Sequence, residues 1–261
     1  MTNTNCQIIL VGHSSFKLTL SIDKEIVHKI IFVTEKEKLS GTEETLKILP
    51  ELVKMYEQRK IEVEHVEFDF HIQTKPIAQL IYLILQQRQI GYKNIVVNIS
   101  GGLRYMSIWF YIACSLTGTR IIHADYKYEG KEEVGINSNI ELITLPFNNI
   151  TDRQFEFLEL FFEANYKLGD FFSQEYSFDD HFVLKKKKKY TSLEHLRKTL
   201  EARKGISLTR GSINGYIKKL QNLSTLEISP NPEDRKEKTI TISYLGIAFF
   251  LQNLYNKLLN T

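Results

Sequence analysis

The 261-residue chain contains little of what identifies the commonest protein classes. Its two cysteines, Cys6 and Cys114, lack C-x-x-C spacing and nearby histidine clusters, so a disulfide or zinc site is not expected. Apolar runs such as Ile108 to Ala113 are far shorter than the roughly 20 residues that span a membrane. A basic, apolar leader segment is also missing. We therefore expect a cytoplasmic protein with no membrane partner and no bound metal.

The sequence also lacks several motifs of nucleotide-driven enzymes and hydrolases. Neither G-x-G-x-x-G nor G-x-x-x-x-G-K-[ST] occurs, and H-E-x-x-H and G-x-S-x-G are missing too. Five histidines, His13, His28, His65, His71 and His123, are scattered and are interpreted as structural or solvated, although His13 lies in a candidate ligand loop. These absences disfavour nucleotide-driven redox or hydrolytic chemistry, and we expect no cofactor.

Charge is distributed unevenly along a chain whose composition, 43% apolar and 25% charged, is otherwise ordinary. Residues 1–150 carry 16 basic and 17 acidic side chains, and residues 151–180 carry two basic and eight acidic ones. Residues 181–261 carry 16 basic and six acidic side chains, a net charge of +10. A separate basic module with a polyanionic partner is one interpretation, and a solvated lysine-rich surface is the other.

The first 146 residues alternate short β-branched runs with longer helical patterns. This alternation predicts an α/β fold with a Rossmann-like, mostly parallel sheet, spanning residues 1–147. The last two predicted strands form an antiparallel hairpin. Predicted strands cover residues 7–11, 27–34, 61–68, 94–99, 120–128 and 140–145, and predicted helices cover residues 41–60, 75–89 and 103–116.

Pro146 marks a predicted boundary. Residues 148–190 are interpreted as a linker with an aromatic interdomain or dimer helix over 151–172 and a loop at Lys185 to Lys189. Residues 191–261 then follow the order helix, short turn, helix, β-hairpin, helix. This order predicts a C-terminal winged helix-turn-helix domain.

Three loops follow the carboxyl ends of predicted parallel strands, where open α/β sheets bind ligands. They are Gly12 to Ser15, Ser40 to Thr42, and Ser100 to Arg104. Paired glycines before a helix let backbone N–H groups approach an anion, and Arg104 adds a cation that suits phosphate. A phosphate-bearing ligand is one interpretation of these loops. A glycine turn that eases strand–helix packing is the alternative.

The stretches ILVGHSSF, LSGTEETL and VVNISGGLRYMSIWFYIA, in this order and spacing, resemble the three ligand loops of CARF (CRISPR-associated Rossmann fold) sensor domains. With the predicted winged helix, the chain resembles the archaeal CARF–winged-helix transcriptional regulators of CRISPR antiviral defence. The resemblance implies a homodimer whose paired sensor domains bind a cyclic oligoadenylate, often cyclic tetra-adenylate. It implies that the following residues line the cleft: Gly12, His13, Ser14, Ser40, Gly41, Thr42, Ser100, Gly101, Gly102, Arg104 and Met106.

Three other functions remain open at this point. Some CARF domains cleave their ligand with a serine and a basic residue, so Ser14 or Ser15 with Arg104 would be the catalytic residues of a slow ring nuclease. A metabolite-responsive repressor would share the same architecture. An effector nuclease is disfavoured, because the letters DRK at Asp234, which fit a nuclease motif, lie in the predicted wing.

Double-stranded DNA is the partner expected for the C-terminal domain. Its second helix supplies candidate contacts to base edges and nearby phosphates, which are Thr209, Arg210, Ser212, Asn214 and Tyr216. The candidate backbone contacts are Lys218 and Lys219 on this helix, and Arg235, Lys236 and Lys238 at the wing. Gly211 and Gly215 depart from this pattern, since glycine weakens a helix. A protein-binding helix or a purely dimerising domain is the alternative.

Overall fold

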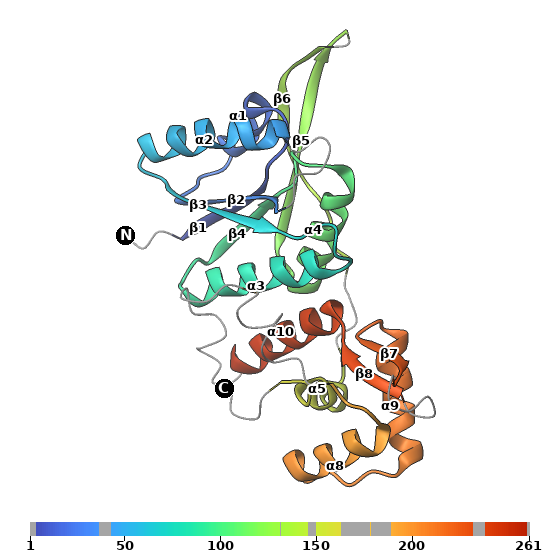
Figure 1. The fold of residues 1–261 in the computed structure, drawn as a ribbon. Coiled ribbons are helices and arrows are strands. Elements are labelled where there is room, and N and C mark those ends of the chain that lie inside the picture. Colours follow the sequence, from blue (N-terminus) through green and yellow to red (C-terminus); the bar gives the residue numbers. More distant parts are fainter. Residues whose placement is uncertain are drawn as a thin grey trace. The chain divides into compact units, whose positions relative to one another are not determined.

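The computed structural model describes residues 4–36, 43–130, 132–145, 150–162, 178, 189–231 and 238–259. The chain divides into two compact units, Met1–Phe147 and Asn148–Thr261 (Figure 1). Each unit is described by itself.

A six-stranded sheet forms the centre of the first unit. The strand order is β3-β2-β1-β4-β5-β6, and the first five are parallel while β6 pairs antiparallel with β5. The predicted mostly parallel sheet is therefore confirmed. The order reverses between β1 and β4, the position at which open α/β sheets bind ligands. The strands are β1 (Asn5–Leu10), β2 (Lys29–Glu35), β3 (Glu62–Phe68), β4 (Asn94–Asn98), β5 (Arg120–Glu129) and β6 (Glu132–Glu141).

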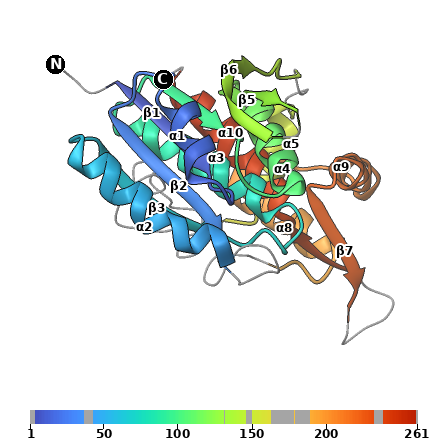
Figure 2. The same cartoon turned by 90° about the horizontal axis from the view of Figure 1, so that it is seen from above.

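Helices cover both faces of this sheet (Figures 1 and 2). α1 (Ser15–Ile22) and α2 (Glu43–Gln58) pack on one face. There, Leu18, Leu49 and Tyr56 form one apolar core with Ile9 of β1 and with Val11, which follows β1. α3 (Lys75–Gln89) and α4 (Arg104–Thr117) lie on the other face and pack against each other.

Two elements of this unit differ from the sequence-based expectation. Helix α1 was not predicted, because SFKLTLSI alternates polar and apolar residues as a strand does. The last strand was predicted at residues 140–145, but β6 occupies 132–141 with the polar sequence EEVGINSNIE. An edge strand that faces solvent is held by backbone pairing with its neighbour and needs no apolar alternation.

The second unit contains four helices and a two-stranded hairpin among its described residues. They are α5 (Asp152–Glu159), α8 (Leu193–Lys204), α9 (Arg210–Asn222), β7 (Leu226–Pro230), β8 (Lys238–Ile242) and α10 (Tyr244–Leu259). An isolated bridge from Tyr190 to Ile240 adds one more residue to the hairpin sheet. The predicted order of helix, helix, hairpin and helix after residue 191 is thus observed.

Helix α5 packs within the second unit. The ring of Phe155 stacks on Phe250 of α10 at 5.5 Å, and the ring of Phe157 stacks on Tyr216 of α9 at 5.2 Å. Residues 150–162, which belong to the expected linker, therefore contribute to the core of this unit. Residues 163–172 of the aromatic segment and Lys185 to Lys188 lie outside the described residues.

In the part of the chain that the structure describes, no helix combines the length and apolar character needed to cross a membrane. The same residues contain no group of three or more His, Cys, Asp or Glu side chains placed to hold a metal ion. Both cysteines are free thiols and buried.

Candidate ligand site

The loops that follow β1 and β4 meet backbone to backbone at the carboxyl edge of the sheet. A Cβ atom on Gly12 would lie 2.6 Å from the backbone nitrogen of Gly102 and 2.8 Å from the Cα of Gly101. A Cβ atom on Gly101 would lie 2.5 Å from the backbone nitrogen of Gly12 and would also overlap the carbonyl oxygen of Leu10. Both glycines are thus required for the contact between these loops.

Gly102 is required for a second reason. Its φ angle is +77°, a conformation that side chains rarely adopt, and a Cβ atom would lie 2.5 Å from Cγ of Leu10. The turn between β4 and α4 is therefore fixed in shape, and it places the start of α4 beside the loop after β1.

Ser100 fixes the same turn through its own polar groups. Its Oγ accepts a hydrogen bond from the backbone N–H of Ala124 at 2.8 Å and lies 3.1 Å from Oγ of Ser21. Its carbonyl oxygen accepts a hydrogen bond from the hydroxyl of Tyr126 at 2.8 Å. The predicted ligand residue Ser100 thus uses its hydroxyl within the protein.

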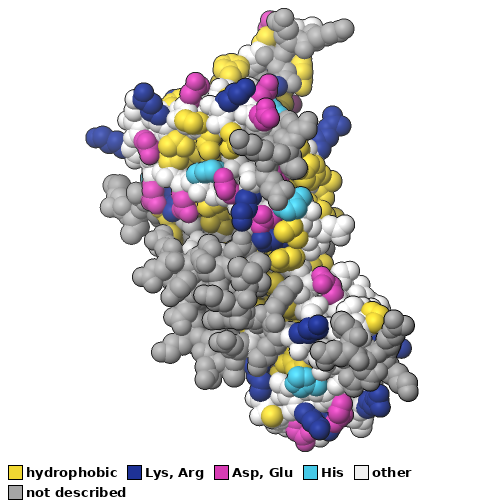
Figure 3. Space-filling model, in the orientation of Figure 1, with side chains coloured by type: hydrophobic (Ala, Val, Ile, Leu, Met, Phe, Trp, Pro, Cys, Tyr) yellow, Lys and Arg dark blue, Asp and Glu magenta, His cyan; other side chains and the backbone are white. Residues whose placement is uncertain are grey.

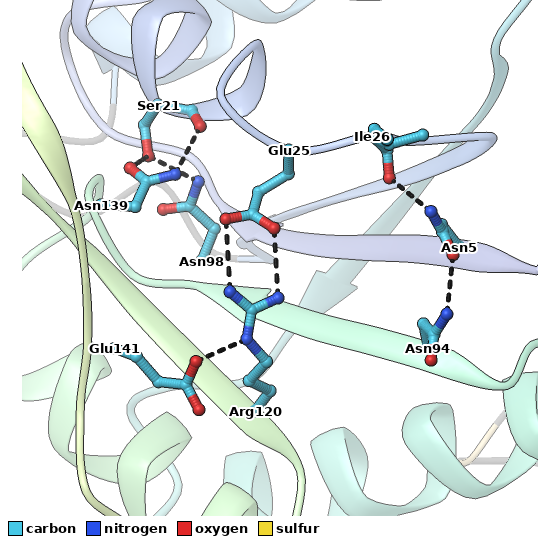
Figure 4. A network of polar contacts seen from close by, with 9 residues as sticks. All are labelled: Asn5, Ser21, Glu25, Ile26, Asn94, Asn98, Arg120, Asn139 and Glu141. Carbon is cyan, nitrogen blue, oxygen red and sulfur yellow. Dashed lines mark hydrogen bonds and ion pairs between the residues drawn. The ribbon is translucent and has the colours of Figure 1, made fainter.

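Ser21 links this turn to two asparagines that the sequence analysis missed (Figure 4). Asn98, at the end of β4, donates to Oγ of Ser21 at 2.9 Å, and Ser21 donates to Oδ1 of Asn139 in β6 at 2.8 Å. Asn98 is fully buried, so its amide needs hydrogen-bond partners. The signal in the sequence was the position of an asparagine at the end of the apolar run of β4.

The two helices that begin at this edge are capped differently. Ser14 caps α1, and its Oγ accepts a hydrogen bond from the backbone N–H of Lys17 at 3.4 Å. The N-cap of α4 is Leu103, which supplies no side-chain hydrogen bond, and the first turn of α4 contains no acidic residue. Arg104 begins this helix, is exposed, and forms no ion pair with the described residues. The N-terminus of α4 therefore offers free backbone N–H groups and a cation to an anionic ligand.

A shallow hollow lies beside this helix start. It brings together three predicted residues, namely His13, Gly102 and Met106, of which Met106 is only 3% exposed. Thr34 and Glu35, at the end of β2, and Thr45 in α2 also line it and were not predicted. Ser40, Gly41 and Thr42 lie outside the described residues, but Glu35 and Thr45, on either side of that segment, both line the hollow.

Glu35 gives the hollow a carboxylate. Its buried side chain accepts a hydrogen bond from the backbone N–H of Phe70 at 3.1 Å and lies 3.7 Å from Nδ1 of His71. Burial, together with the charge of Glu35, raises the pKa of Tyr105 in the first turn of α4. The site therefore combines donors at the start of α4 with an acceptor at the end of β2.

In the second unit, most of the predicted DNA-contacting side chains of α9 lie on its exposed surface. Buried Ile213, Ile217 and Leu220 hold α9 to the unit, and the ring of Tyr216 stacks on Phe157. Thr209 caps the helix by accepting a hydrogen bond from the backbone N–H of Ser212 at 3.2 Å. The exposed predicted residues are Thr209, Arg210, Ser212, Asn214, Lys218, Lys219 and, on β8, Lys238.

A groove of about 580 Å³ separates the start of α8 from α9 and the hairpin. Arg210, Asn214, Lys218 and Lys238 line it together with Glu194. Lysine and arginine side chains are visible across this unit in Figure 3. Arg235 and Lys236, which were predicted at the wing tip, lie outside the described residues.

Comparison with known proteins adds little to this geometry. No protein-family model matches the chain, and no curated protein matches it. Among solved structures, a protein from Vibrio cholerae described as protein VC1899 is similar over 96% of this chain, with 11% sequence identity and a TM-score of 0.38. The chain spans 65% of that protein's length. A likeness of this degree assigns neither fold nor function.

Proposed function

We propose that the protein is a CARF-type regulator that binds a cyclic oligoadenylate in its first unit and double-stranded DNA in its second. The observation that carries the proposal is the uncapped start of α4, which the glycine contact between two loops holds at the reversal point of the sheet. The first unit would bind its ligand as a homodimer, and cyclic tetra-adenylate is the ligand that we expect.

Phosphate groups suit the donors of this site. Free N–H groups at a helix start bind anions, and the guanidinium of Arg104 can donate two parallel hydrogen bonds to one phosphate. A ring of phosphates with two-fold symmetry would meet this arrangement twice in a homodimer. The carboxylate of Glu35 would accept a hydrogen bond from a ribose hydroxyl or from the exocyclic amine of adenine, because both are donors.

Exposed apolar side chains near these loops support dimer formation. Phe16 in α1 and Ile108 in α4 are each 57% exposed, and Tyr105 also reaches the surface. Apolar side chains appear between charged ones on the face of the first unit in Figure 3. Exposed large apolar side chains are available for contact with a protein partner. A second copy of the chain would cover them and add a second Arg104 to the site.

The sensor proposal is tested with thermal shift and calorimetry of the full chain with cyclic tri-, tetra- and hexa-adenylate. At least one of them should raise the melting temperature, because a ligand that binds only the native state stabilises it. Arg104→Glu should weaken that binding at least 10-fold, whereas Lys47→Glu on the exposed surface of α2 should leave it unchanged. No shift with any of the three rings would overturn the proposal. Chromatography of the incubated ring tests whether Ser14 or Ser15 supports cleavage.

We propose a winged helix for the second unit because its elements follow that order and the groove beside α9 is lined by Arg210, Lys218 and Lys238. Helix α9 would enter the major groove, and Gly211 and Gly215 would allow its backbone to approach the DNA, since a Cβ atom on Gly215 would meet nothing within 4 Å.

Duplex binding measured by fluorescence anisotropy at several salt concentrations tests this second proposal. Affinity should fall steeply with salt, and Lys218→Ala should reduce the slope of log K against log salt by about 1 if Lys218 contacts a phosphate. Lys54→Ala, on α2 of the first unit, is the charge-matched control. Salt-independent or undetectable duplex binding would overturn the DNA assignment.

A further inference from the structure

The amino edge of the sheet, opposite the candidate ligand site, contains a cavity of about 560 Å³. It opens where β1, β4 and β5 begin, and the loop between α1 and β2, residues 24–27, forms part of its lining. This size lies within the range of small-molecule sites. The residues that line it come from five separate segments and form no sequence motif.

The floor of this cavity includes an unusual polar side chain. Gln7 lies in β1 between Cys6 and Ile8, is 1% exposed, and lines the cavity. Neither its Nε2 nor its Oε1 has a hydrogen-bond partner among the described residues. A buried amide that leaves its donor and acceptor unused costs free energy, about 1 to 3 kcal/mol for each group. Both atoms are shielded from the open space of the cavity, so Gln7 offers one donor and one acceptor to a molecule that displaces the side chains around it.

The lining of the cavity is strongly basic. Four cations, Lys24, Arg88, Lys93 and Arg120, line it with one carboxylate, that of Glu25. Lys24 and Lys93 are exposed and form no ion pair with the described residues, so their ammonium groups are available to a ligand. The neutral donor and acceptor of Gln7 are thus buried behind the wall of the cavity, and the ammonium groups of Lys24 and Lys93 are exposed.

Polar contacts hold the 24–27 loop against this edge (Figure 4). The guanidinium of Arg120 donates to both carboxylate oxygens of Glu25, at 3.1 and 3.4 Å, and its Nε donates to Glu141 at 2.6 Å. Nδ2 of Asn5 donates to the carbonyl oxygen of Ile26 at 2.9 Å. The side chain of Ile26, 79% exposed, adds an apolar surface to the lining of the cavity.

We propose that this cavity binds a nucleoside monophosphate. The amide of Gln7 pairs with the donor–acceptor edge of the base, as glutamine does with adenine in DNA recognition. Lys24 and Lys93 bind the phosphate at the rim, and Ile26 packs against the base or sugar. The site is separate from the proposed cyclic-oligoadenylate site, because it lies at the opposite ends of the strands.

Calorimetry of the full chain with AMP, GMP, CMP and UMP, each at 0.01 to about 1 mM, tests this proposal. One or more should bind, and the matching nucleoside and inorganic phosphate should each bind at least 10-fold more weakly. Gln7→Met, which keeps the length of the side chain but removes the amide, and Lys93→Glu should each weaken binding at least 10-fold. Lys54→Glu, on α2, should leave it unchanged.

Nucleotide binding by the Arg104→Glu variant distinguishes this site from the proposed sensor site. Nucleotide binding should persist in that variant even if binding of the cyclic ligand is lost. Lys93→Glu lies on the surface, so a loss of binding in it at unchanged melting temperature reflects the site rather than the fold. Three results would each overturn the proposal: no binding of any nucleotide at 1 mM, equal binding of inorganic phosphate, or loss of binding in Arg104→Glu but not in Lys93→Glu.

Discussion

The two edges of the sheet in the first unit are built in opposite ways. At the carboxyl edge, Gly12 and Gly101 bring two loops into direct backbone contact. A Cβ atom on either glycine would overlap backbone atoms of the other loop. At the amino edge, side chains such as Gln7 and Arg120 surround an open cavity. Backbone contact gives a rigid frame for helix starts, whereas a side-chain lining leaves space and unused polar groups. Substitutions should therefore have large effects at the first edge and smaller ones at the second.

The largest effect is expected from Gly101→Ala. The new Cβ atom would overlap the carbonyl oxygen of Leu10 and the nitrogen of Gly12, and backbone atoms cannot move aside as a flexible side chain can. We expect a loss of at least about 3 kcal/mol in the free energy of unfolding, as for severe overpacking. Urea denaturation measures it.

Gly135→Ala is the matched control, because a Cβ atom at that position of β6 meets nothing within 4 Å and its φ angle is not positive. It should change stability by less than about 0.5 kcal/mol. Equal stabilities of Gly101→Ala and Gly135→Ala would show that the loops at the carboxyl edge can move to accommodate a Cβ atom. That result would contradict a rigid carboxyl edge.

The second largest effect is expected at the amino edge, from Lys29→Met. Lys29 is nearly fully buried at the start of β2, and its Nζ lies 2.9 Å from carboxylate oxygens of both Glu62 and Glu64. Burial alone would lower the pKa of Lys29, but the hydrogen bonds to the two carboxylates raise it. Because both glutamates remain partly solvated, we expect a loss of about 2 kcal/mol at pH 7, the scale of charged hydrogen bonds.

The pH dependence of this loss gives a further check. Burial alone would raise the pKa of Glu62, yet its hydrogen bonds with Lys29 and Tyr92 lower it below the usual 4.5. A lowered folded-state pKa stabilises the protein above the unfolded-state pKa, and this contribution is lost as pH falls through the folded-state value. The difference between wild type and Lys29→Met should therefore shrink below pH 4.5. A difference that stays constant down to pH 3 would contradict the pairing.

The fold of the first unit could be predicted from the sequence to a large extent, because β-branched runs separated by helical patterns specify a parallel sheet. Helix α1 was not predicted because its polar and apolar residues alternate as in a strand. Strand β6 was predicted at the wrong residues because pairing at a sheet edge requires no apolar side chains. Both are held by neighbours rather than by their own sequence. Local pattern alone could not identify them.

The two edges differ in the same respect. Gly12 and Gly101 stood out in the sequence, but their contact with each other joins residues far apart in the chain and became visible only in the fold. Ser100 was selected as a ligand residue, and its hydroxyl oxygen accepts a hydrogen bond from the backbone N–H of Ala124, a contact that the sequence does not reveal. Gln7 was not predicted as a site residue, because a polar residue inside an apolar strand is informative only when its surroundings are known.

A smaller effect is expected from Cys6 at the amino edge, and it depends on pH. Burial raises the pKa of this thiol from 9.0 to about 12. A raised folded-state pKa means that the stabilising contribution is complete below pH 9 and is lost as pH rises toward 12. Between pH 8 and 10, wild type should lose about 1 kcal/mol more stability than Cys6→Ala. Cys114 is common to both proteins, so parallel stability curves would contradict the shift.

The smallest change in global stability is expected from Arg120→Ala, yet this variant tests the comparison most directly. Its ion pairs with Glu25 and Glu141 are exposed to solvent, so their loss should cost only about 0.5 kcal/mol. The pair with Glu25 also holds the 24–27 loop, however, and local opening requires less free energy than global unfolding. Hydrogen exchange should therefore quicken in a peptide covering 24–27 in the variant.

A peptide covering residues 100–103 provides the internal control, because its turn is held by the glycine contact and by Ser100 rather than by Arg120. Its exchange should stay as in wild type. If both peptides exchanged faster by the same factor, the two edges would open together as one cooperative unit, and the cavity would depend on the same contacts as the carboxyl edge. If only the 24–27 peptide changed, the amino edge would open by itself, which would give a small molecule a route to Gln7 without disturbing the helix starts on the other side.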